Sequence, residues 1–231
     1  MADRSRPDAG TATPLAGVLW DLDGTLIDSE PVWREAQLRL AAEFDSSWSS
    51  ADGLAYAGRP MEVTIAAMQA SGIQVSAELI RARVLREVTE SLRRHLPWCA
   101  GALELVEELR GARVAQAIVT TSPRSMVDVV LDWLPPDTFA VVVSGDDVTR
   151  RKPDPEPYLA AVRALGAVPG RCVAIEDSPS GLASALAAGV VTIGVPNGTD
   201  LPPAPGWTRL PSLRDLGIEE LHELLEVGST N

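Results

Sequence analysis

The stretch at residues 18–25 reads VLWDLDGT. An apolar run from Gly17 to Trp20 leads directly into two carboxylates, Asp21 and Asp23, and then into Gly24. The run is too short for an amphipathic helix and a glycine follows it, so it predicts a buried strand. Residues two apart on a strand point to the same face. The two carboxylates therefore repel one another unless a cation or a shared reaction holds them at the carboxyl end of the strand, where open α/β sheets bind ligands.

The acidic pair has two other interpretations. Acids can simply occupy the turn after a strand, without any chemistry. A calcium-binding helix–loop–helix also begins with alternating acids, but Thr25 stands where a third acid belongs and Val32 where the closing glutamate belongs. The calcium loop is therefore excluded, whereas the plain turn stays open.

The composition of the 231-residue chain is that of an ordinary globular protein, with 45% hydrophobic residues. The net charge of −12 argues against nucleic acid or an anionic membrane as a partner, because both favour clustered Lys and Arg. A phosphorylated substrate stays possible, since a metal ion or a few local cations can govern one site. Cys99 and Cys172 form neither a disulfide framework nor a metal-ligand pattern, which fits a reducing compartment. We expect a monomer in the cytoplasm.

The N-terminal residues 1–14 are polar, small and proline-containing. They lack the apolar segment of a signal peptide, so we predict a disordered tail. No apolar stretch approaches the roughly 20 residues that span a bilayer.

Residues 29–96 form an all-helical block in the sequence pattern. A helix begins near Ser29-Glu30-Pro31, and the pattern predicts three helices: about 31–44, 60–70 and 76–95, the last capped by Ser76. The block is far longer than an ordinary connection, so it predicts an inserted cap domain. The remaining parts, 15–28 and 97–231, would form the main domain, with hinges near 26–30 and 95–99.

From Pro97 onward the pattern alternates between strands and helices. Short apolar runs with helices between them predict a Rossmann-like, doubly wound parallel α/β sheet with helices on both faces. The expected strands are 114–120, 139–143, 171–175 and 190–195, with a short edge strand near Trp207, and the expected helices are 101–110, 123–133, 155–165, 179–188 and 213–226.

Polar side chains follow the predicted strands. Thr120-Thr121-Ser122 follows the second strand, Glu176-Asp177 follows the fourth, and Lys152 lies in the loop after the third. Parallel strands end along one edge, so these groups converge on Asp21 and Asp23. Ser122 and Ser178 have a plainer interpretation as helix caps, and Lys152 as a solvated lysine. Together, however, acids with a hydroxyl and a lysine suit a divalent cation and a phosphate.

These residues resemble the four ordered motifs of the haloacid dehalogenase superfamily. The motifs are Asp21-Leu22-Asp23-Gly24-Thr25-Leu26, Thr120, Lys152 and Glu176-Asp177, and the helical insertion is similar to the cap of the phosphoglucomutase-like branch. The resemblance covers residue 17 to the C-terminus. Within the branch, the run from Asp28 to Trp33 is similar to sugar-phosphate and hexitol-phosphate phosphatases.

The resemblance implies a role for each motif. Asp21 would be the nucleophile that forms an aspartyl phosphate, and Asp23 the acid and base. Mg²⁺ would be held by Asp21, the main-chain carbonyl of Asp23 and Asp177, with Glu176 nearby. Gly24, Thr120, the Thr121 amide and Lys152 would surround the phosphate oxygens.

The substrate would be a small phosphorylated metabolite, such as a sugar or polyol phosphate, selected by the cap. The candidates for this selection are Arg59, Trp33, Tyr56 and Met61, although Trp33 and Met61 also fit apolar packing. In the mutases that this branch contains, a histidine and an arginine serve the transfer. The matching positions here hold Trp33 and Met61, with Arg59 close to the second position, and the missing histidine in particular favours a phosphatase over a sugar phosphomutase.

Two non-enzymatic alternatives remain. A signalling receiver domain also combines paired acids, a Thr or Ser and a Lys, but its acidic pair precedes a lone acceptor on a later strand. An inert binding protein could keep the same motifs. Multiple-turnover release of phosphate would exclude both.

Overall fold

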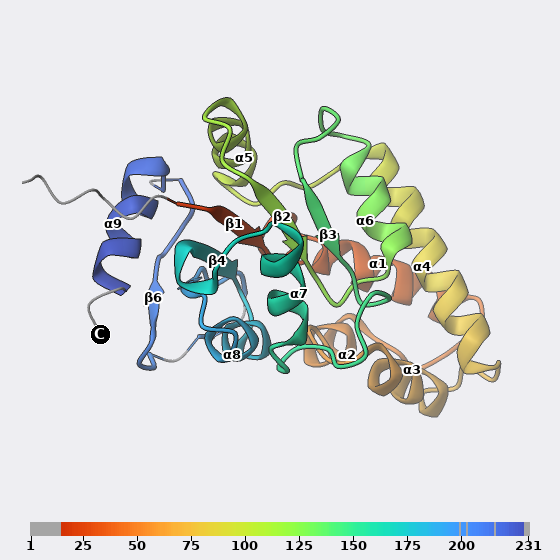
Figure 1. The fold of residues 1–231 in the computed structure, drawn as a ribbon. Coiled ribbons are helices and arrows are strands. Elements are labelled where there is room, and N and C mark those ends of the chain that lie inside the picture. Colours follow the sequence, from red (N-terminus) through yellow and green to blue (C-terminus); the bar gives the residue numbers. More distant parts are fainter. Residues whose placement is uncertain (1–14, 199, 202, 215, 229–231) are drawn as a thin grey trace, which may run out of the picture.

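The computed structural model describes residues 15–228 except 199, 202 and 215, so the predicted tail at 1–14 lies outside the described residues. Six strands form one parallel sheet in the order β3-β2-β1-β4-β5-β6, which confirms the predicted fold class (Figure 1). The strands are β1 (Gly17–Trp20), β2 (Gln116–Val119), β3 (Val141–Val143), β4 (Cys172–Glu176), β5 (Val191–Gly194) and β6 (Trp207–Arg209). The short strand predicted near Trp207 is thus present at the edge.

Helices cover both faces of the sheet, because successive strand residues point to opposite sides. Val18 and Trp20 face one apolar cluster and Leu19 the other. The first face is covered by α5 (Ala102–Gly111), α6 (Arg124–Leu131) and α9 (Ile218–Gly228), and the second by α7 (Glu156–Ala164) and α8 (Pro179–Ala187). A short 3-10 helix, Pro169–Arg171, precedes β4. Since both faces are buried, the central strands read as continuous apolar runs.

The helical block contains four helices, one more than the sequence pattern predicted. They are α1 (Glu30–Ala42), α2 (Ser50–Ala55), α3 (Met61–Ala70) and α4 (Ala77–Arg94). The missed helix α2 has only six residues and includes a glycine, so it has no visible apolar period. A capping box between Ser49 and Asp52 starts it instead. The predicted cap at Ser76 is confirmed, because its hydroxyl accepts from the Leu79 amide at 3.2 Å.

Two linkers join this block to the sheet, and they pair with each other. The Asp28 amide donates to the Pro97 carbonyl at 2.8 Å, and the Cys99 amide to the Leu26 carbonyl at 2.9 Å. A further contact joins the block to the main domain, where the Trp133 indole donates to the Leu92 carbonyl at 3.2 Å. Figure 1 shows α4 running beside α6. The division into two rigid bodies with a hinge stays a prediction.

The last helix begins at Ile218 and not at the predicted Leu213. Its first amides are bound by acids, because the Gly217 amide donates to Glu220 at 2.9 Å and the Ile218 amide to Glu108 at 3.1 Å. Leu213 is buried in the segment before the helix, and its backbone lies close to Gly101 at the start of α5. These long-range contacts fix the helix start, and a local apolar pattern does not reveal them.

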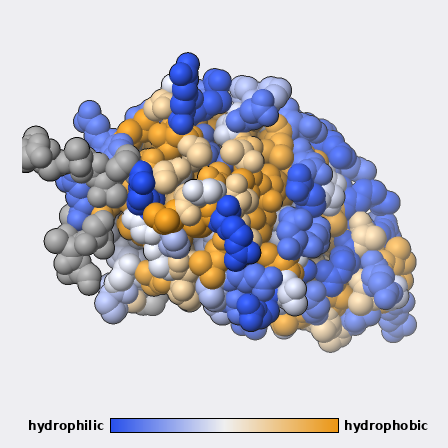
Figure 2. Space-filling view, viewed as in Figure 1, coloured by the Kyte–Doolittle hydropathy of each residue, from blue (hydrophilic) through white to orange (hydrophobic). Residues whose placement is uncertain are grey.

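The exposed faces of the helices are mostly polar. On the face shown in Figure 2, hydrophilic side chains stand out around the rim, and hydrophobic ones show between them in the middle. None of the helices in the described part of the chain is long and apolar enough to cross a bilayer.

We expect Gly101→Ala to destabilise the fold by roughly 3 kcal/mol, because Gly101 has a φ of +88° and an added Cβ would lie 2.5 Å from the backbone of Leu213. Gly166→Ala is the matched control, since Gly166 has a φ of +65° but open space around it. Its cost should be about 1 kcal/mol. Urea unfolding measures both, and equal losses would show that the contact with Leu213 does not matter.

Candidate active site

The acidic pair lies where β1 ends, at the carboxyl edge of the sheet. Asp21 is buried and its amide donates to the Ile175 carbonyl of the neighbouring strand β4 at 3.0 Å. The chain then turns tightly, with the Gly24 amide bound to the Ile27 carbonyl at 2.8 Å. Gly24 has a φ of +87°, and a Cβ there would lie 2.0 Å from a carboxylate oxygen of Asp177. Only glycine lets this turn approach Asp177 so closely.

Lys152 is not a solvated lysine, because its side chain is only 2% exposed. Its ammonium donates to Asp21 Oδ1 at 2.6 Å, to Glu176 Oε1 at 2.5 Å and to the Val119 carbonyl at 2.8 Å. The lysine thus joins the ends of β1, β2 and β4. Both of its acidic partners are buried, so the ion pairs are shielded from water.

Glu176 is held from several directions at the end of β4. Its side chain accepts from the Tyr158 hydroxyl at 2.6 Å and from the Ser178 hydroxyl at 3.1 Å. It also packs against Gly181 in the first turn of α8, where a Cβ would lie 1.9 Å from the carboxylate. Sequence reasoning missed Tyr158, since a single aromatic residue on an amphipathic helix indicates only packing. Ser178 does cap α8, as its plainer interpretation predicted.

Asp23 is bound by three neutral donors. The hydroxyl of Ser29 and the indole of Trp33, the latter at 3.4 Å, donate to Oδ1, and the Ser122 hydroxyl donates to Oδ2 at 2.5 Å. The interpretation of Ser122 as a helix cap was wrong. Pro123 occupies the N-cap position of α6 and Ser122 turns toward Asp23. Trp33, proposed either to face the substrate or to pack in the core, reaches the acidic pair from α1.

The remaining predicted residues lie around this centre. Thr120 is buried at the end of β2 and its hydroxyl accepts from the Ser122 amide at 3.0 Å, whereas the Thr121 side chain is exposed. In the helical block, the Arg59 guanidinium lies 5.2 Å from the centre of the Tyr56 ring. The loop that carries both is tied to the start of α1, because the Gly58 amide donates to Glu30 at 3.1 Å. No described contact joins Arg59 or Tyr56 to the acidic pair.

Three of the acids have the arrangement of metal ligands. Asp21, Glu176 and Asp177 each offer an oxygen atom, and these atoms lie within 4.8 Å of one another. Oxygen ligands suit a small, hard cation such as Mg²⁺. Among the described residues, Lys152 is the one cation that forms ion pairs with these acids, with Asp21 and Glu176. The three acids, once ionised, outnumber this cation. The residues therefore fit a divalent cation.

Burial, followed by the neighbouring charges, shifts the protonation of this cluster. Burial raises the pKa of Asp21 to about 8, which Lys152 opposes and Glu176 reinforces. Burial, followed by Asp21 and Glu176, raises the pKa of Asp177 to about 9. For Lys152, burial lowers the pKa, but Asp21 and Glu176 raise it to well above the ordinary value. Without a cation, the cluster thus retains protons that a bound metal would displace.

The structure thus brings a carboxylate pair, a lysine and an acidic cluster together along the carboxyl edge of a parallel sheet. The sequence profile of the haloacid dehalogenase-like hydrolases matches residues 18–195. The chain belongs to this family. Several of its relatives are named phosphatases, which is consistent with a phosphoric monoester hydrolase.

Two relatives and one solved structure illustrate the similarity. The chain is 34% identical to validoxylamine A 7'-phosphate phosphatase of Streptomyces hygroscopicus subsp. limoneus over 77% of this chain and 84% of that protein. It is 35% identical to hexitol phosphatase A of Escherichia coli (strain K12) over 80% of this chain and 85% of that protein. A putative beta-phosphoglucomutase of Thermotoga maritima shares the fold, with a TM-score of 0.72 and 29% sequence identity. The match covers 93% of this chain and 98% of that protein.

We expect the metal-free protein to become less stable as the pH rises. The substitution Asp177→Asn should make this dependence of stability on pH weaker. Between the ordinary Asp pKa of 3.8 and about 9, the folded state holds protons on Asp21 and Asp177 that the unfolded state has lost. The free energy of unfolding therefore falls with rising pH in this window. Mg²⁺ binds the ionised acids, so it should stabilise the protein more at about pH 9 than at about pH 6.

Urea unfolding with and without Mg²⁺ at each pH measures this, and the difference between wild type and Asp177→Asn isolates the contribution of the cluster. A Mg²⁺ stabilisation that is equal at both pH values, and equal in the variant, would contradict a metal site at these acids.

Proposed function

We propose that the protein is a magnesium-dependent phosphatase that hydrolyses a small phosphorylated metabolite through an aspartyl phosphate on Asp21. The observation that carries the proposal is the position of Asp21, which Lys152 holds at 2.6 Å beside Glu176 and Asp177. A carboxylate that a buried cation orients at the edge of a sheet is suited to act as a nucleophile. Mg²⁺, held by Asp21, Asp177 and the Asp23 carbonyl with Glu176 nearby, would supply positive charge to the phosphate oxygens.

In the first step, an Asp21 oxygen attacks phosphorus, and the bond from phosphorus to the leaving oxygen breaks. Asp23 passes its proton to that oxygen, so the alcohol leaves neutral. Lys152, Thr120 and the Thr121 amide would stabilise the charge on the oxygens of the moving phosphoryl group, and Gly24 allows the backbone to approach them. The serines and the indole that bind Asp23 fix its direction.

In the second step, water attacks the aspartyl phosphate, and Asp23 takes the proton from this water. The bond between Asp21 and phosphorus breaks, inorganic phosphate leaves and both acids return to their starting state. Hydrolysis through an acyl phosphate thus divides one difficult displacement into two easier ones.

A sugar or polyol phosphate is the substrate class that we infer. The support comes from relatives that are named hexitol phosphatase A and validoxylamine A 7'-phosphate phosphatase. Arg59 and Tyr56, whose loop is tied through Gly58 to the start of α1, are our candidates for contacts with the substrate's non-reacting end. The block at 29–96 would act as a cap that opens and closes over the site about the two paired linkers.

Asp21→Asn should lower phosphatase turnover by at least about 10³-fold, because the amide keeps the shape but is not a nucleophile. Asp23→Asn should cost about 10²–10⁴-fold for a sugar phosphate and much less for p-nitrophenyl phosphate, whose leaving group needs no proton. Phosphate release at saturating substrate and Mg²⁺ measures both. The control is Asp132→Asn, which removes an exposed carboxylate at the end of α6. Turnover by Asp21→Asn that matches this control would overturn the mechanism.

We also expect hydrolysis to exceed mutase activity. A mutase must return its phosphoryl group to a sugar hydroxyl, yet Trp33 contacts Asp23 where those enzymes use a histidine, and an indole cannot accept a proton. The test supplies β-glucose 1-phosphate with a trace of glucose 1,6-bisphosphate and Mg²⁺. Free phosphate should form faster than glucose 6-phosphate. The reverse order would identify a mutase, while absence of both products points to another substrate only if p-nitrophenyl phosphate is hydrolysed.

A further inference from the structure

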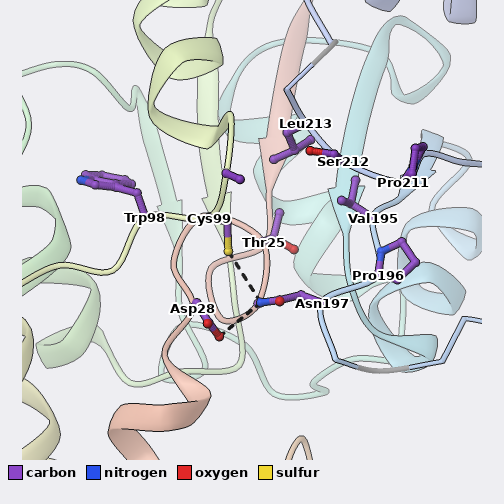
Figure 3. A pocket seen from close by; sticks show the side chains of 12 residues that line it. Thr25, Asp28, Trp98, Cys99, Val195, Pro196, Asn197, Pro211, Ser212 and Leu213 are labelled. Carbon is purple, nitrogen blue, oxygen red and sulfur yellow. Dashed lines mark hydrogen bonds between the residues drawn. The ribbon is translucent and has the colours of Figure 1, made fainter.

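A cavity of about 290 Å³ lies next to the loop that follows the acidic pair (Figure 3). Its wall combines this loop (24–25), Asp28 of the first linker, residues 98–100 of the second linker, the loop after β5 (195–197) and the segment 211–213 before α9. None of the acids that fit a metal lines it, and neither does Lys152. The cavity therefore adjoins the candidate active site, because Gly24 lies in its wall, but it contains neither the metal-fitting acids nor the lysine.

One wall of this cavity holds a hydroxyl group without a partner. Thr25 is 1% exposed, and its hydroxyl forms no hydrogen bond with any described group. Buried hydroxyls in folded proteins normally have a partner. In Figure 3 the Thr25 oxygen lies on the side of its loop that faces Asn197 across the cavity. A ligand that offers a hydrogen bond here would satisfy a group that the chain leaves unsatisfied.

The electrostatics of the cavity favour a cation. Asp28 is the one ionisable acid in the lining, and none of the twelve described lining residues is Lys, Arg or His. The only side-chain hydrogen bond to Asp28 among the described residues comes from the neutral amide of Asn197 at 3.3 Å. Burial, followed by Asp28 and the acids of the active site, raises the pKa of Cys99 to about 12. An anion in the cavity would face the same repulsion as a Cys99 thiolate.

Most of the rest of the lining is apolar, with Ser212 as the exception, and the cavity is larger than a bare metal ion needs. Val195, Pro196 and Leu213 supply hydrocarbon surface opposite the polar groups. The volume corresponds to a small organic molecule, since one water occupies roughly 30 Å³ of liquid. We propose that the cavity binds a small organic ammonium ion, with its charged nitrogen between Asp28 and the Thr25 hydroxyl and its hydrocarbon part against Val195 and Leu213.

Such an ion would act on the connection between the helical block and the sheet. The cavity is lined by both linkers and by Asn197, which donates to Asp28 and, at 3.7 Å, to the sulfur of Cys99. A ligand between these segments would hold them together. The backbone bonds of Asp28 and Cys99 that pair the linkers should then open less often, and their amide hydrogens should exchange more slowly.

The test uses three probes of equal size and different charge: n-butylammonium, n-butanol and butyrate. Each is titrated into the full-length protein at constant ionic strength and followed by NMR signals of the Asn197 side chain and the Thr25 and Cys99 amides. Saturating Mg²⁺ is present, so that an ammonium ion bound at Asp21, Glu176 and Asp177 is displaced. We expect saturable shifts with n-butylammonium only, together with slower exchange at Asp28 and Cys99.

Asp28→Asn keeps an acceptor for Asn197 and should weaken binding at least about tenfold, because a charge-assisted bond is lost. Thr25→Val, which keeps the shape, should weaken it about fivefold. Asp132→Asn is the surface control and should bind like wild type. Equal shifts with all three probes, displacement by Mg²⁺, or binding that both cavity variants retain would overturn the proposal. These measurements do not involve turnover, so they test the ammonium site independently of the proposed phosphatase activity.

Discussion

The buried ammonium of Lys152 is the constraint on which the carboxyl edge of the sheet depends. It lies between Asp21 and Glu176, at 2.6 and 2.5 Å, and also reaches the carbonyl at the end of β2. Removing one member of such a buried set leaves an uncompensated charge, which typically costs about 3–5 kcal/mol. The lysine comes from the loop after β3, so this loop must fold back over β2 and β1. The ion pairs therefore fix the loop as well as the charges.

The acids outnumber this lysine. The chain brings them close together at two positions that are occupied by glycine. Gly24 lets the turn after β1 lie against Asp177, and Gly181 lets the first turn of α8 lie against Glu176. Any other residue at either position would push a carboxylate away. The arrangement thus concentrates negative charge that one lysine cannot balance. A divalent cation with few protein ligands is the natural complement of such a site. In the metal-free site, burial raises the pKa values of Asp21 and Asp177, and neighbouring acids raise them further.

Short-range patterns predicted most of the fold and the centre of the site. The apolar runs identified the five strands β1 to β5, because the central strands are buried on both faces, whereas β6 was expected only as a short edge strand near Trp207. The parallel order then placed Asp21, Thr120, Lys152 and Asp177 at one edge. Short-range sequence patterns gave wrong or incomplete predictions where contacts between distant residues determine the structure. The start of α9 depends on Glu108, which lies 110 residues away. Ser122 looked like a helix cap and donates to Asp23 instead, and Tyr158 looked like packing and binds Glu176. In each case the sequence shows a local role, and only the folded chain supplies the distant partner.

Asp23 is the point at which three parts of the chain meet. Ser122 binds one of its oxygens from the main domain, whereas Ser29 from the first linker and Trp33 from α1 bind the other. If the helical block moves about its linkers, the donors on Oδ1 move with it and the donor on Oδ2 does not. The direction of this carboxylate then depends on the position of the block. Because an indole donates a hydrogen bond but accepts no proton, Trp33 can orient Asp23 without competing for the proton that Asp23 transfers in the proposed mechanism. This separates the orientation of the acid from its proton chemistry, which suits an enzyme whose acceptor is water.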